Sequence, residues 1–262
     1  MFGVVPKSIW SKLNPADNNN LCTWAMRCLL IEDAEKLVLI DCGLGNKQSE
    51  KFFSYYQPHG DDTLEKSLKA HGFTPNDVTD VILTHLHFDH CGGAIMKDNG
   101  KYTPMFKNAT YWSDETHWDW ALHPNERERA SFLKENIRPI QQSGQLRFLK
   151  KGDEVFPGFD FFLSSGHTEA MIIPQIRYKD QTIVYMADLI PSSGHIPVGY
   201  VMGYDIRPLN TMEEKAEFLR KACNENYILF FEHDRVVECC SLQMTEKGVR
   251  LDNAMSLQEA IA

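Results

Sequence analysis

The sequence predicts a single α/β domain spanning residues 1–262, and three observations support this class. Short apolar runs, each suited to one buried strand, alternate with stretches of helical spacing. A chain of 262 residues is long enough to bury a full core, and one layered domain of this size is ordinary. The composition is globular, with 43% hydrophobic and 11% aromatic residues.

The most informative segment follows the apolar run at 81–83, which predicts a buried strand. Four strong metal-ligand side chains come next: His85, His87, Asp89 and His90. Side chains two apart on an extended backbone point the same way, so we expect His85 and His87 to face one ion. Asp89 and His90 are adjacent, and we expect them to serve a second ion. Zn²⁺ favours such ligands, and an open position on the ion activates water near neutral pH.

The elements around this segment follow from spacing and turn signals. We expect strands at 22–31 and 37–40, joined by the polar turn 32–35. Helical spacing predicts a helix over 64–70. Gly92-Gly93 should let the backbone turn tightly and begin the next helix.

The second half of the chain is expected to alternate strands and helices. The helix over 211–224 has the clearest start, because Thr211 and Glu214 match a capping box. The remaining expected elements are helices beginning at 113–116 and covering 124–136, and strands at 109–112, 172–178, 182–187 and 227–231.

Residues 85–90 resemble the H-x-H-x-D-H signature of the metallo-β-lactamase superfamily. The family's three later ligands have counterparts in His167, Asp188 and His233, each after an apolar or aromatic run. Leu37–Gly43 matches the family's early strand, which ends in Asp-x-Gly. The resemblance covers most of the chain and implies the four-layer αβ/βα sandwich of that superfamily.

The resemblance also implies a dinuclear centre. Its seven ligands form three sets: His85, His87 and His167 on one ion, Asp89, His90 and His233 on the other, and Asp188 bridging both. A hydroxide between the ions would attack a carbonyl or phosphoryl centre, which makes Asp89 and Asp188 expected catalytic residues. Zinc is the default metal, although iron and manganese also suit these ligands. Asp41 is expected either to orient a ligand histidine or merely to cap a turn.

His233-Asp234 after an apolar strand is similar to the ending of N-acyl-homoserine lactonases and organophosphate hydrolases. The resemblance therefore implies hydrolysis of a small ester or lactone. Two positions depart from that branch: its Gly-His-Thr-Pro-Gly-His is replaced by residues 166–171, and its substrate-binding Tyr is replaced by Pro191. Three residues are candidates to bond the substrate carbonyl instead: Tyr200, Tyr204, and His195, which also fits a loop position without a catalytic role.

Other function classes fit less well. A thioester hydrolase like glyoxalase II is the runner-up, although its basic glutathione-binding C-terminal helices are not evident. A phosphodiesterase or nuclease comes third, because a net charge of −9 disfavours a nucleic-acid partner. A non-catalytic or redox member of the fold would require lost ligands or a fused flavin domain, and the sequence has neither.

Residues 105–150 interrupt the simple alternation and gather aromatic side chains and histidines. One interpretation is a helical cap whose aromatics line an apolar substrate pocket beside the metals. The other is ordinary packing of a helical pair on the domain. The side chains concerned are Trp112, His117, Trp118, Trp120 and His123.

The remaining signals concern location and partners. No apolar run is long enough for a membrane span, and residues 1–30 lack the order of a signal peptide, so we expect a cytoplasmic protein without a membrane partner. The seven cysteines include no C-x-x-C pair and predict buried or half-buried thiols rather than disulfides, Cys42 and Cys91 included. The sequence does not indicate an oligomeric state.

Overall fold

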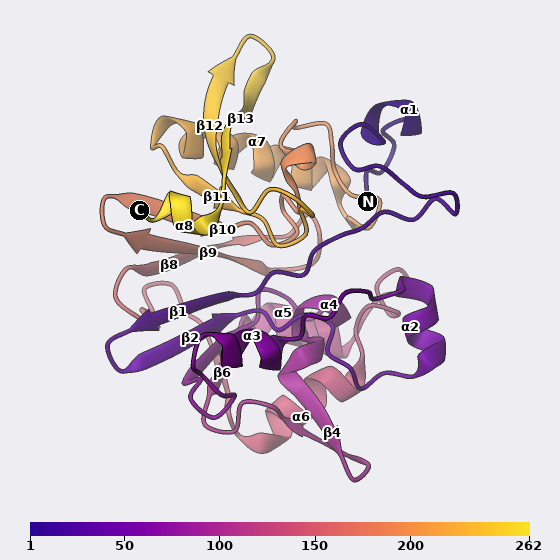
Figure 1. The fold of residues 1–262 in the computed structure, drawn as a ribbon, viewed down its shortest axis with the longest axis vertical. Helices are drawn as coiled ribbons and strands as arrows, with labels where there is room; N and C mark the ends of the chain where they lie inside the picture. Colours follow the sequence, from indigo (N-terminus) through magenta and orange to yellow (C-terminus); the bar gives the residue numbers. More distant parts are fainter. The chain divides into compact units, whose positions relative to one another are not determined.

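The computed structural model describes residues 1–262 and divides them into two compact units, each with its own sheet (Figure 1). One unit consists of residues 28–151, and the other joins residues 1–27 to 152–262. Both contain mixed sheets and helices, which confirms the α/β class. The assignment of a single domain stays a prediction.

The sheet of unit 28–151 has five strands in the order β1-β2-β3-β6-β7. β1 and β2 form an antiparallel hairpin, and the other neighbours are parallel. The strands are β1 (Leu29–Asp33), β2 (Lys36–Ile40), β3 (Asp80–Ile82), β6 (Thr110–Ser113) and β7 (Leu146–Phe148), with a separate hairpin of β4 (Ile95–Asp98) and β5 (Lys101–Pro104). The helices are α2 (Glu50–Tyr56), α3 (Leu64–Ala70), α4 (Phe88–Cys91), the 3₁₀ turn η1 (Gly92–Ala94), α5 (Glu115–Leu122) and α6 (Lys134–Ser143).

The sheet of unit 1–27/152–262 has six strands in the order β13-β12-β11-β10-β9-β8. β10 and β11 are parallel, and every other pair is antiparallel. The strands are β8 (Phe159–Ser164), β9 (Met171–Tyr178), β10 (Gln181–Tyr185), β11 (Ile228–Phe230), β12 (Cys239–Thr245) and β13 (Gly248–Met255). The helices are α1 (Lys7–Trp10), the 3₁₀ turn η2 (Ser193–His195), α7 (Pro208–Asn224) and α8 (Leu257–Ala260). α7 packs against β12 and β13. None of the helices combines the length and the apolar character that a membrane span needs.

Parallel strands place the candidate ligands. Because the carboxyl ends of parallel neighbours lie at one edge of a sheet, residues just beyond them gather there. Asp41 follows β2, and His85 comes shortly after β3. In the other unit Asp188 comes shortly after β10, and His233 comes shortly after β11.

Several expected elements are confirmed. α3 has the predicted bounds 64–70, and β2, β9 and α7 contain the ranges predicted for them. The bounds of two expected elements are wrong. Residues 22–28 are not a strand beside β1, because the N–H groups of Ala25 and Arg27 donate to the carbonyls of His233 and Glu232. Residues 126–131 form turns, the rest of 124–133 is irregular, and α6 begins only at Lys134.

Local side-chain bonds explain the second error. The Asn125 side chain accepts from the N–H groups of Arg127 and Glu128, at 2.9 and 3.1 Å. Such bonds compete with helical ones. The expected capping box is also wrong, because α7 begins at Pro208 and the Glu214 carboxylate is used elsewhere.

The aromatic residues of 105–150 belong in part to the core. Trp118 is buried in the hydrophobic cluster of unit 28–151, and Trp120 packs against that cluster. This position supports the packing interpretation for Trp118, while the cap stays a prediction. All seven cysteines are free, as expected, and Cys42 and Cys91 lie in the same cluster.

Gly92 and Gly93 have a different role from the one expected. The helix begins before them, at Phe88, and the glycines form the 3₁₀ turn that follows it. A Cβ on Gly93 would lie 2.1 Å from the carbonyl oxygen of Cys42, and one on Gly92 would lie 2.1 Å from that of Leu44. The glycines therefore let the histidine-bearing turn lie directly against the loop after β2.

We predict that Gly93→Ala lowers the free energy of unfolding by about 1–3 kcal/mol, because the new methyl group must displace the Cys42 backbone. Thermal melting measures the effect. Gly199→Ala is the matched control, since a Cβ there meets nothing within 4 Å. Equal melting temperatures for the two variants would contradict this packing argument.

Candidate metal centre

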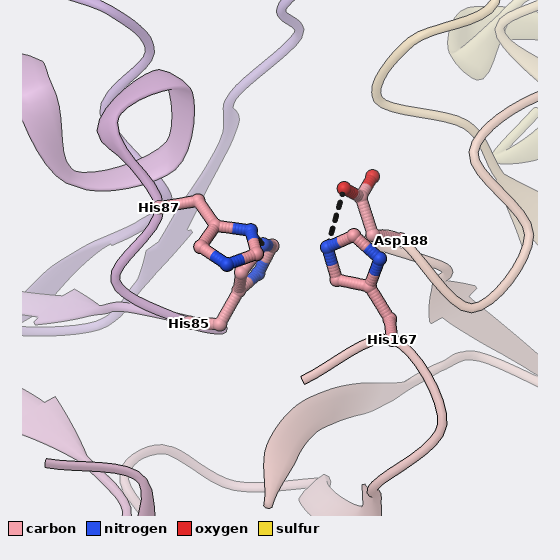
Figure 2. Close-up of side chains that lie close together, drawn as sticks. All are labelled: His85, His87, His167 and Asp188. Carbon is pink, nitrogen blue, oxygen red and sulfur yellow. Dashed lines mark hydrogen bonds and ion pairs between the residues drawn. The ribbon is translucent and has the colours of Figure 1, made fainter. Parts of the chain in front are cut away.

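His85 and His87 lie side by side just after β3 (Figure 2), with His85 Nε2 3.1 Å from His87 Nδ1. The Thr84 hydroxyl gives its proton to Asp41 at 2.6 Å, so its oxygen accepts from His85 Nδ1–H at 3.1 Å. This assigns the proton of His85 to Nδ1 and leaves Nε2 as the atom with a lone pair. Two neighbouring ring nitrogens of this kind suit a shared cation, as the two-residue spacing predicts.

His90 is oriented by a carboxylate. Asp41 Oδ2 lies 3.1 Å from His90 Nδ1, and Asp41 Oδ1 accepts from the Thr84 N–H at 2.8 Å. This is the contact that the orienting hypothesis for Asp41 predicts. The other nitrogen of His90, Nε2, lies 3.9 Å from Asp89 Oδ1. Asp89 and His90 therefore present donor atoms to a common point.

Asp188 connects two histidines of unit 1–27/152–262. Its Oδ2 lies 3.1 Å from His167 Nε2, the contact dashed in Figure 2, and its Oδ1 lies 3.1 Å from His233 Nε2. One oxygen per histidine is an arrangement that suits a bridging carboxylate. All three side chains are buried.

His167 lies between two carboxylates. Its Nδ1 lies 3.0 Å from Asp205 Oδ1, on the side of the ring opposite Asp188. Burial by itself would lower the pKa of His167, but Asp188 and Asp205 outweigh it and raise the pKa to about 10. The surroundings of this ring therefore favour positive charge, which fits a metal site.

The loop that carries His167 is held from both sides. Glu214 on α7 accepts from the N–H groups of Ser165 and Gly166, at 2.9 and 3.2 Å. Arg207 donates to the Ser165 carbonyl and to Glu169, both at 2.7 Å. These contacts hold the part of the loop where the lactonase pattern has Pro-Gly-His. In this chain Glu169 lies there and forms an ion pair with Arg207.

His233 is oriented by the N-terminal arm. Its Nδ1 donates to the carbonyl of Ala25 at 2.8 Å, and the Ala25 N–H donates back to the His233 carbonyl at 3.1 Å. Asp234 accepts from the N–H and hydroxyl of Ser193, at 2.9 and 2.6 Å. Because Nδ1 is bonded to the Ala25 carbonyl, Nε2 is the nitrogen of His233 that faces Asp188 and that could coordinate a metal.

The five histidines share one pattern: one ring nitrogen faces an orienting partner, and the other faces donor atoms. The partners are Thr84 for His85, Glu128 for His87, Asp41 for His90, Asp205 for His167 and the Ala25 carbonyl for His233. Metal-ligating histidines behave in this way. Nitrogen and carboxylate donors on buried histidines and aspartates fit zinc and similar divalent ions.

His195 occupies a structural position. It is fully buried, its ring stacks on Phe2 with centroids 4.3 Å apart, and its Nδ1 lies 2.7 Å from the Ser192 hydroxyl. Burial lowers its pKa to about 3. These contacts favour the alternative of a loop histidine, and a catalytic role of His195 stays a prediction. The Tyr204 side chain, in contrast, is 62% exposed. The carbonyl of Pro191 accepts a hydrogen bond from the His233 N–H, at 3.1 Å.

Two mixed sheets flanked by helices, with buried histidines and aspartates beyond the ends of parallel strands, define an α/β metalloenzyme. The chain belongs to the metallo-beta-lactamase superfamily, whose sequence model matches residues 27–233. This confirms the family expected from the motif and the fold that it implied.

Known relatives agree with this assignment to the superfamily. An N-acyl homoserine lactonase of Bacillus thuringiensis is 28% identical over 241 residues, which is 87% of each chain. A probable metal-dependent hydrolase from Staphylococcus aureus has a structure with TM-score 0.88 and 28% identity, covering 97% of this chain and 90% of its own. AidC, a dizinc quorum-quenching lactonase, shares the fold with TM-score 0.75 and 23% identity, covering 89% and 81%. The chain is thus a lactonase-like, metal-dependent hydrolase of this superfamily.

We predict a pH effect on stability from His195. Its pKa is lowered from 6.5 to about 3, so between these values the unfolded chain takes up a proton that the folded chain refuses. Stability is therefore lost as pH falls below 6.5, by up to about 1.4 kcal/mol per pH unit. The variant His195→Gln lacks this proton uptake.

Denaturant unfolding of both proteins at pH 7 and pH 4.5 measures the effect. The excess stability of the wild type over His195→Gln should shrink at the lower pH. Titration of the N-terminal amine and Lys215, which also face this ring, is common to both proteins. A difference that is the same at both pH values would show that His195 is not held neutral.

Proposed function

We propose that this hydrolase cleaves a small ester or lactone with two divalent ions, zinc by default. One observation carries the proposal: the two oxygens of Asp188 are directed separately at His167 and His233. Two oxygens directed at different histidines suit a carboxylate that is shared by two ions. The lactonase relatives support the substrate class, and the dizinc relative supports the number of ions.

The proposed ligands are the seven residues that match the family motif. His85, His87 and His167 would hold one ion, Asp89, His90 and His233 would hold the other, and Asp188 would serve both. When bound, the ions supply Lewis acidity for the substrate carbonyl and an activated water near neutral pH. The protein's own contribution is orientation, because the partner on the second nitrogen of each histidine keeps the donor atom in place.

The substrate-binding residue differs from that of the lactonases. Pro191 has no side-chain donor, and its carbonyl is already bonded to the His233 N–H. Tyr204 lies in the following loop and its side chain is exposed. We therefore keep Tyr204 as the proposed partner of the substrate carbonyl and do not extend that proposal to His195.

The test combines metal analysis with a substrate panel. Protein prepared without chelator should carry close to two equivalents of metal. The panel contains N-acyl homoserine lactones, aryl esters, S-lactoylglutathione and β-lactams, and lactones or esters should give the highest kcat/KM. One equivalent that persists with added metal would exclude the dinuclear proposal, and preference for the thioester would replace the substrate class.

We predict that Asp188→Asn reduces kcat by at least about 100-fold on the best substrate of that panel, because the neutral amide cannot balance two cations. The metal-free variant should melt below the wild type, because it loses the buried charge beside His167 and His233, so kcat is compared at a temperature where both proteins are folded. A variant that retains two metals and near wild-type kcat would show that Asp188 does not bridge.

A further inference from the structure

The segment between β6 and α6, residues 114–133, contacts the histidine-rich turn at three points. The Leu86 N–H donates to His117 Nε2 at 2.8 Å, and the Phe88 N–H donates to the Ser131 carbonyl at 3.0 Å. Between these two residues lies His87, whose Nε2 is 3.6 Å from Glu128 Oε1. All these residues belong to unit 28–151.

Glu128 is a buried carboxylate with a defined direction. Only 3% of its surface is exposed. Its Oε2 accepts from the indole N–H of Trp120 at 2.9 Å and from the side-chain amide of Asn125 at 2.5 Å. Two donors on Oε2 fix the plane of the carboxylate and direct Oε1 towards the His87 ring.

The position of Glu128 bears on which nitrogen of His87 is free to bind a cation. The Nδ1 atom of His87 faces His85 Nε2 at 3.1 Å, so the donor atoms of the two rings meet on that side. A carboxylate near Nε2 favours the tautomer with its proton on that nitrogen. Glu128 therefore lies on the same side of His87 as an orienting partner would, at 3.6 Å, a longer distance than the 3.1 Å between Asp41 and His90.

We propose that Glu128, held by Trp120, is a positioning residue for metal binding by His87. The segment that carries it would act on the ion through this ring, and Trp120 would have a role other than lining a substrate pocket. The inference rests on the proposed metal site and requires nothing of the substrate.

The test is a metal titration of metal-free protein with Zn²⁺ in competition with a chromophoric chelator. Glu128→Gln keeps the size of the side chain and removes its charge. We expect it to weaken binding of one ion by about 10–100-fold and to leave the other within about 2-fold, because loss of an orienting partner has an effect of this size. In the Co²⁺-loaded protein, the visible absorption of that one site should change.

Asp80→Asn is the matched control. Asp80 is a buried carboxylate of the same unit that also accepts from an indole N–H, Trp112 Nε1 at 2.8 Å, and its other partners are Thr79 and Lys36. This variant should keep wild-type affinity for both ions. Trp120→Phe keeps an aromatic side chain but removes the indole N–H that donates to Glu128, and it should weaken binding of the same ion by a smaller factor.

Thermal melting of the metal-free variants separates folding from binding, and Trp120→Phe remains available if Glu128→Gln does not fold. Wild-type affinity for both ions in the Glu128 variant, or equal weakening by Asp80→Asn, would overturn the proposal. Because the titration uses no substrate, a protein that fails on every lactone and ester can still bear the proposal out.

Discussion

The contact that orients each of the five candidate ligand histidines is the constraint on which the site depends. A buried imidazole with one nitrogen held by a partner has a single orientation and a single tautomer. The other nitrogen then presents its lone pair in a fixed direction. In this chain the partners differ in kind, from a threonine hydroxyl to a backbone carbonyl, yet each leaves one nitrogen towards the other donors.

The backbone also helps to position these side chains. Parallel strands bring Asp41 near His85 in one unit and Asp188 near His233 in the other. Asp41 and Ala187 have φ values of 57° and 42°, which are costly for residues with a Cβ. The strain lies directly beside the ligands, where the chain must leave a strand and turn a side chain inwards.

The sequence predicted the donor residues and most of the elements that carry them. The spacing of His85 and His87 was informative because it reflects local backbone geometry, and the apolar runs before Asp188 and His233 marked true strand ends. Helix 64–70 was found for the same reason, since its signals are local.

The orienting partners were largely missed because they lie far along the chain. Asp205 is in a polar loop whose sequence carries no sign of His167, and Glu128 was placed on a helix that the Asn125 bonds prevent. The Ala25 carbonyl is a backbone group that every residue type has, so it cannot be predicted from the sequence. Glu214 illustrates the same limit: it looked like part of a helix cap, whereas it accepts from the loop that carries His167.

The most direct test of this account is a crystal structure of the metal-loaded protein, with anomalous scattering used to place the ions. The account predicts that His87 coordinates through Nδ1 and that His85, His90, His167 and His233 coordinate through Nε2. It also predicts an oxygen of Asp188 on each of two ions. Coordination of His87 through Nε2, or a ring turned so that its orienting partner is lost, would contradict it.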